Sequence, residues 1–131
     1  MRVARWEDRL VEFIDERAGK AFAWGQNDCA TFASDWVRIC TGQTLFEATY
    51  DDVHGAAEEL ASRGGMQAAV TAVLGEPRPN PKAAQRGDVG LVETEGRVSL
   101  VVVIGAQVVG PGEERMTVLP LTALLTAWRV G

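Results

Sequence analysis

The sequence contains few of the residues that metal centres and disulfide frameworks require. Its 131 residues include one histidine and two cysteines, with no paired-cysteine motif and no HExxH motif, so we expect no metal and no cofactor. If one helix carries both Cys29 and Cys40, they lie roughly 16 Å apart at a rise of ~1.5 Å per residue. A disulfide requires Cα atoms within about 7 Å. We therefore predict two free thiols.

The sequence also lacks a surplus of basic residues and a long apolar run. It has 13 Lys and Arg against 18 Asp and Glu, for a net charge of −5, which excludes the electrostatic signature of a nucleic-acid-binding protein. The N-terminal MRVARWEDRL has no apolar core and does not resemble a signal peptide. The longest apolar stretch, residues 100–110, is interrupted by Gly105 and Gln107 and is too short to cross a bilayer. We expect synthesis in a bacterial cytoplasm and no membrane insertion.

The length and composition fit one globular domain spanning residues 1–131. Hydrophobic residues make up 47% of the chain and charged residues 24%, which is typical of a folded protein. A stretch rich in proline and glycine, residues 75–88, separates a helical half from a strand half. Neither half is large enough for a secure core of its own, so we interpret the stretch as an internal connection.

Helical periodicity dominates the first half. Apolar side chains recur at helical spacing over residues 6–17 and 29–41. Asp28 or Asn27 is a suitable N-cap for the second of these helices, because a short side-chain oxygen accepts hydrogen bonds from unpaired N–H groups. Two shorter helices are expected at about 52–62 and 66–74.

The second half has the pattern of an antiparallel sheet. Strands are expected at 89–93, 97–105, 107–110 and 115–120, followed by a helical turn at 121–125 and a final TAWRV segment. Helices followed by antiparallel strands indicate an α+β fold, with the N-terminal helices packed on one face of the sheet.

Cys29 is the strongest candidate for chemistry in the sequence. At the first turn of a helix, unpaired N–H groups and the helix dipole stabilise a thiolate and lower the thiol pKa. The apolar stripe of the helix directs Cys29 inward, where a histidine on a neighbouring strand would complete a cysteine hydrolase. The alternative is structural, since free cysteine often serves as a small buried apolar residue.

Several motifs together resemble the NlpC-type cell-wall peptidases, which are papain-like. They are Trp24-Gly25-x-x-Asp28-Cys29-x-x-Phe32, the turn Arg86-Gly87-Asp88-Val89, and the strand 98–105. Short phage-tail and prophage members are the most similar, because in them a helix precedes the Cys motif and the chain ends as Ala127-Trp128-Arg129-Val130 does here. The resemblance implies a papain-like fold with Cys29 as the nucleophile. Trp24 and Asp28 are candidate cleft residues beside Cys29; the alternatives are packing within the turn for Trp24 and the N-cap role for Asp28.

The sequence departs from that family at the catalytic base. Counting back from Gly105, the position of the family's histidine falls on Ser99, and serine cannot act as a base near neutral pH. The third polar member of the triad is also missing, since Val109-Gly110-Pro111 supplies none. His54 is a weaker candidate for a substitute base, because its position does not match the strand histidine. A surface histidine near a helix start is the favoured interpretation, and Asp51 and Asp52 would raise its pKa if they are close in space.

These observations predict a degenerate relative in the tail tip or hub of a phage or phage-like particle. Such a protein would act in tail structure or assembly, and its partners would be other tail proteins. The alternative is an active cysteine hydrolase that cleaves peptidoglycan stem peptides with Cys29 as the nucleophile. A third hypothesis is a bacterial amidase with a rearranged triad, which would require an imidazole within hydrogen-bond reach of Cys29.

Overall fold

The computed structural model describes residues 1–46, 65–94 and 96–131, and these residues form an α+β fold of helices and one antiparallel sheet. The helices are α1 (Trp6–Arg17), α2 (Cys29–Thr41) and α4 (Met66–Leu74). The strands are β1 (Val89–Thr94), β2 (Arg97–Val103), β3 (Gln107–Gly110), β4 (Thr117–Pro120) and β5 (Thr126–Trp128). Two short 3₁₀ helices, η1 (Pro81–Ala83) and η2 (Leu121–Ala123), complete the described elements.

The sheet has the order β4-β3-β2-β1-β5, and every neighbouring pair is antiparallel. The β1–β2 hairpin pairs Val92 with Ser99 at its centre. The last strand returns to the other side of β1, where Trp128 pairs with Val89. The C-terminal Ala127-Trp128 segment is therefore an integral edge of the sheet.

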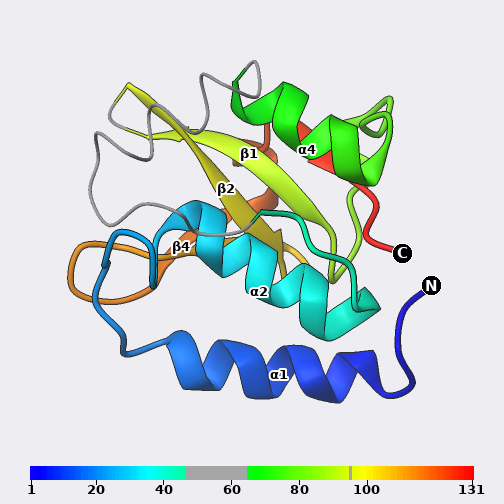
Figure 1. The fold of residues 1–131 in the computed structure, drawn as a ribbon. Helices are drawn as coiled ribbons and strands as arrows, with labels where there is room; N and C mark the ends of the chain where they lie inside the picture. The colour runs from blue at the N-terminus through cyan, green and yellow to red at the C-terminus, as the bar shows by residue number, and fades with distance from the viewer. Residues whose placement is uncertain (47–64, 95) are drawn as a thin grey trace.

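The helices form two layers on one side of the sheet (Figure 1). Helix α2 lies between α1 and the sheet, and α1 packs on α2 through Phe13, whose ring centroid is 4.9 Å from that of Phe32 and 5.9 Å from that of Trp36. The prediction that the N-terminal helices pack on the sheet is thus right for α2 and wrong for α1. The apolar stripe of α1 is covered by aromatic rings of α2, so α1 forms an outer layer.

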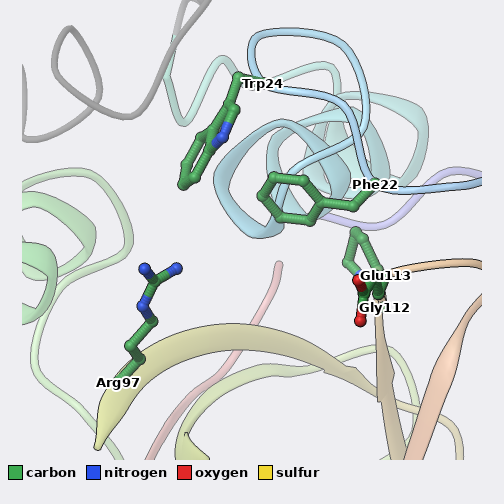
Figure 2. A pocket seen from close by; sticks show the side chains of 6 residues that line it. Phe22, Trp24, Arg97, Gly112 and Glu113 are labelled. Atoms are coloured by element: carbon green, nitrogen blue, oxygen red, sulfur yellow. The ribbon is translucent and has the colours of Figure 1, made fainter. Parts of the chain in front are cut away.

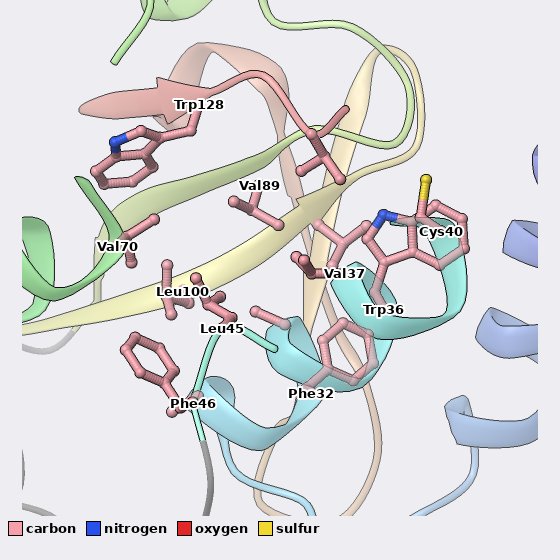
Figure 3. Packing of buried hydrophobic residues seen from close by; sticks show 14 of the residues in the cluster. Phe32, Trp36, Val37, Cys40, Leu45, Phe46, Val70, Val89, Leu100 and Trp128 are labelled. Atoms are coloured by element: carbon pink, nitrogen blue, oxygen red, sulfur yellow. The ribbon is translucent and has the colours of Figure 1, made fainter. Parts of the chain in front are cut away.

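Alternation along β1 and β2 divides their apolar side chains between the two faces of the sheet. Leu100 and Val102 belong to the main core with α2, α4 and Trp128, and Figure 3 shows this packing around Phe32, Trp36 and Val70. Val101 and Val103 belong to a second cluster on the other face. Leu124 belongs to that cluster and lies so close to Gly90 that a Cβ there would approach Leu124 Cδ2 to 2.4 Å. The second face is thus covered by the segment around η2.

The predicted elements agree with the structure in type, and the differences lie at their ends. The helices at 6–17, 29–41 and 66–74 and the strand at 107–110 are confirmed within a residue. Strand β2 stops at Val103, before Gly105, whose φ of 130° leaves the extended region. Strand β4 begins at Thr117 rather than at 115. The helix predicted at 52–62 lies outside the described residues, and none of the described helices is long and apolar enough to cross a membrane.

Candidate functional site

The turn before α2 is fixed by hydrogen bonds from both of its polar residues. Asp28 is the N-cap: its Oδ1 accepts from the Thr31 N–H at 2.8 Å, and its own N–H donates to the Thr31 hydroxyl at 2.9 Å. The Gly25 N–H donates to Asp28 Oδ2 at 2.8 Å. Asn27 donates instead to the Ala21 carbonyl at 2.9 Å. Asp28 is only 1% exposed, so it anchors the turn beneath the surface and lines neither cavity described below.

Cys29 is the first residue of α2 and lines a small cavity at a gap in the sheet. The cavity has a volume of about 60 Å³ and is also lined by Ser99 on β2 and by Gly110 and Pro111 at the end of β3. Strands β2 and β3 pair only at Val102↔Val109 and Val103↔Val108 in the described register. The cavity therefore lies beyond the last of these pairs. It is far smaller than the roughly 300–1,000 Å³ of a typical ligand pocket.

Ser99 and Cys29 share this cavity but belong to different faces of the sheet. Side chains alternate along a strand, so Ser99 lies on the same face as Val101, which packs in the second cluster. Leu100 is the β2 residue that packs toward α2, and its backbone acts to lower the pKa of the Cys29 thiol. A side chain at position 99 is thus directed away from the face on which α2 lies.

Burial raises the pKa of the Cys29 thiol above its ordinary value. Desolvation is the largest cause, backbone hydrogen bonds from Leu100 and Ala30 act in the opposite direction, and the carboxylate of Asp28 raises the pKa further. This direction is opposite to the one expected from a helix start alone. The helix N-terminus does favour the thiolate, but at this half-buried site desolvation and the neighbouring Asp28 carboxylate oppose it.

The polar side chains around the Cys29 cavity are hydroxyls. Ser99, Thr94 and Thr117 line it together with apolar residues, and Cys29 is the only titratable residue among the described residues of the lining. None of these hydroxyls can serve as a general base near neutral pH. His54 lies outside the described residues. Cys40, the second cysteine, is a buried core residue at the other end of α2, and both thiols are free.

The Gly87-Asp88 turn precedes β1 and joins distant parts of the chain. Asp88 is fully buried and accepts hydrogen bonds from Arg2 Nη2 at 3.0 Å and Arg78 Nε at 2.8 Å, and from the backbone N–H groups of Gln85 and Val130. The Gly87 carbonyl accepts from Trp36 Nε1 at 2.8 Å. We name these contacts the Asp88 cluster. It ties both ends of the chain and the Pro-rich segment to the start of β1.

A second, larger cavity adjoins the Cys29 cavity, and Pro111 lines both. It has a volume of about 470 Å³ and is lined by Phe22, Trp24, Arg97, Pro111, Gly112 and Glu113. We name it the aromatic pocket. Figure 2 shows the Arg97 guanidinium extending from β2 toward the Trp24 ring, with Glu113 on the far side beside Phe22. The predicted cleft residue Trp24 therefore lies in a neighbouring pocket rather than in the cavity of Cys29.

Sequence reasoning missed most of the aromatic pocket. No local pattern points to Glu113, and Arg97 is expected only as the first residue of the strand at 97–105. Only Phe22 carried a usable signal, because it precedes Trp24 by two residues and both can contribute to one aromatic surface. The proximity of Arg97 and Glu113 depends on the β2–β3 connection, which no local pattern specifies. Among the described residues, no group of three or more His, Cys, Asp or Glu side chains is placed to hold a metal ion.

The fold and site together define a small α+β protein with a cysteine at the start of a helix that packs on an antiparallel sheet. The family described as "Domain of unknown function (DUF6950)" matches residues 1–130. The chain belongs to this family. No curated protein and no solved structure matches the chain.

Proposed function

We propose that this protein is a non-catalytic relative of the NlpC-type peptidases that acts in the tail tip or hub of a phage or phage-like particle. The observation that carries the non-catalytic part is the Cys29 cavity. Its described lining supplies no base, and burial raises the pKa of the thiol. An acyl-transfer enzyme needs the opposite arrangement, in which a thiolate forms readily and a positioned base moves the proton.

The tail assignment rests on the sequence resemblance to short phage-tail members. Two parts of that resemblance have a clear structural role. The initial helix, α1, covers α2 through Phe13, and the Ala127-Trp128 segment forms β5. These parts complete the fold. They are therefore consistent with a protein kept for its shape and its contacts with other tail proteins.

Deletion of the gene from the phage or prophage that encodes it tests the tail assignment. We expect particles without normal tails by electron microscopy, and we expect both the wild-type gene and a Cys29→Ala gene to restore tails and infectivity. Normal, infectious particles from the deletion would overturn the tail assignment. Restoration by the wild-type gene but not by Cys29→Ala would overturn the non-catalytic part.

The second candidate is a cysteine hydrolase that cleaves peptidoglycan stem peptides. One observation favours it: the partly exposed Cys29 lines a cavity that adjoins the larger aromatic pocket, where a substrate would find room. The base would come from His54 or from a partner chain. Purified protein incubated with muropeptides decides between the candidates, since turnover that disappears in Cys29→Ala would favour the hydrolase.

A further inference from the structure

The aromatic pocket combines features that a purely structural role does not explain. Phe22 and Trp24 are half-buried, and their rings meet edge to face, with centroids 4.6 Å apart and an interplanar angle of 83°. Aromatic side chains left partly exposed around a cavity are typical of binding sites, because they offer apolar surface in a fixed geometry. The pocket is therefore suited to an apolar group that packs against these two rings.

The charges of the pocket lie on either side of this aromatic pair (Figure 2). Arg97 and Glu113 are both exposed, and in the part of the chain that the structure describes neither forms an ion pair. The guanidinium of arginine presents a planar set of donors that fits a carboxylate. The Glu113 carboxylate can accept from a cationic side chain or a backbone N–H. The pocket thus complements a ligand with opposite charges flanking an apolar group.

We propose that the aromatic pocket binds an extended segment of a partner protein in which an acidic and a basic side chain flank an apolar one. The apolar side chain packs on Phe22 and Trp24, the acidic side chain binds Arg97, and the basic side chain binds Glu113. This inference rests on the proposed function, because it identifies the surface through which the protein contacts another tail protein. The carrying observation is charge complementarity around an aromatic cavity of about 470 Å³.

The test is an NMR titration of the ¹⁵N-labelled full chain with capped peptides. The probes are acetyl-Glu-Ala-Leu-Ala-Lys-amide and acetyl-Lys-Ala-Leu-Ala-Glu-amide, which cover both chain directions and place the three side chains on one face of an extended peptide. Each has a matched peptide in which Gln replaces Glu. We expect one of the acidic peptides to shift the Trp24 indole and the Arg97 and Glu113 amides. We expect it to bind on the order of threefold more tightly than its Gln counterpart, as for an exposed ion pair.

A comparison of variants separates a specific contact from a loss of folding. In Arg97→Gln, the Glu and Gln peptides should bind equally, because the partner of the acidic side chain is gone. Arg9→Gln serves as the matched control, since Arg9 is an exposed arginine on α1 outside the lining of the pocket. It should preserve the full difference between the two peptides.

Each remaining outcome overturns the inference. Equal binding of the Glu and Gln peptides to the wild-type protein would show that Arg97 does not bind the acidic side chain. Shifts centred away from the pocket would place the ligand elsewhere. Tighter binding of a muropeptide than of either acidic peptide at the same resonances would assign the pocket to peptidoglycan. Muropeptide turnover measured in parallel keeps the proposals distinct: turnover refutes the non-catalytic function, whereas absent turnover with absent peptide binding refutes only this inference.

Discussion

The polar groups that contact the two halves of α2 have different surroundings. At its C-terminal half, Trp36 contacts the Asp88 cluster, in which a fully buried carboxylate accepts four hydrogen bonds from separate parts of the chain. At its N-terminus, Cys29 has backbone groups and hydroxyl-bearing residues around it and no described titratable side chain in its cavity. Among the described residues, charged side chains therefore surround the buried carboxylate of Asp88, whereas none lines the cavity of Cys29.

This difference distinguishes the residues that stabilise the fold, Asp88 and Asp28, from the Cys29 thiol, which is the group available for a reaction. The Gly87-Asp88 turn fixes the start of β1, so its loss would affect the whole fold. Asp28 likewise caps α2 and holds Gly25. The thiol of Cys29 is not needed for either contact. The contacts that fix these two turns are therefore independent of any chemistry at Cys29.

The largest expected effect is at the Asp88 cluster. We expect Asp88→Ala to lower the free energy of unfolding by about 3 kcal/mol, because removal of one partner leaves Arg2 and Arg78 without their counterion in a largely buried site. Urea denaturation followed by circular dichroism measures this change. Asp8→Ala is the control, since the Arg5–Asp8 pair is exposed and should contribute at most about 0.5 kcal/mol. Equal effects of the two substitutions would contradict the structural role of the cluster.

The next effect concerns the reactivity of the two thiols. Because burial raises the pKa of Cys29, its thiolate fraction near neutral pH is smaller than that of an ordinary thiol, and its alkylation should remain slow until the pH rises above about 8.5. Mass spectrometry of iodoacetamide-treated protein measures the rate at each pH. Cys40 is fully buried and serves as an internal control for opening of the core. An alkylation rate of Cys29 that reaches its plateau below pH 8 would support the cysteine hydrolase hypothesis instead.

A smaller effect is expected from the charge of the N-cap. Asp28→Asn retains a side-chain oxygen for the Thr31 N–H but removes the negative charge that raises the pKa of Cys29. The pKa of the thiol should therefore fall, and the alkylation profile should move to lower pH. The shift should be smaller than the effect of burial, which is the leading cause. An unchanged or higher-pH profile would show that the Asp28 charge does not act on the sulfur.

The sequence predicted the type of nearly every described element, because helical periodicity and alternation are local properties of the chain. Asp28 at the start of α2 and the Gly-Asp turn before β1 were also local signals. The layer order was not, since α1 packs on α2 through ring contacts between Phe13 and side chains distant in sequence. The aromatic pocket was missed for the same reason: Arg97 and Trp24 are brought together only by the complete sheet.

The assignment of Ser99 to the family's histidine position shows the limit of counting along a strand. Counting back from Gly105 identifies a residue in the sequence but not the face of the sheet on which its side chain lies. A shift of one residue along a strand moves the side chain to the opposite face. In this sheet Ser99 shares its face with Val101, whereas Leu100 packs toward α2. A histidine introduced at 99 would therefore approach the shared cavity from the side opposite α2.

The smallest expected effect follows from this geometry. Ser99→His should leave the alkylation rate of Cys29 and its pH dependence unchanged, because an imidazole on the opposite face cannot take the proton from a thiol that lies against the Leu100 backbone. Ser99→Gln controls for the added volume, and both variants are compared with the wild type by mass spectrometry. A faster reaction at neutral pH in Ser99→His alone would mean that the imidazole reaches the sulfur through the gap between β2 and β3. The low reactivity that we expect for Cys29 would then depend on position 99 rather than on the burial of the thiol.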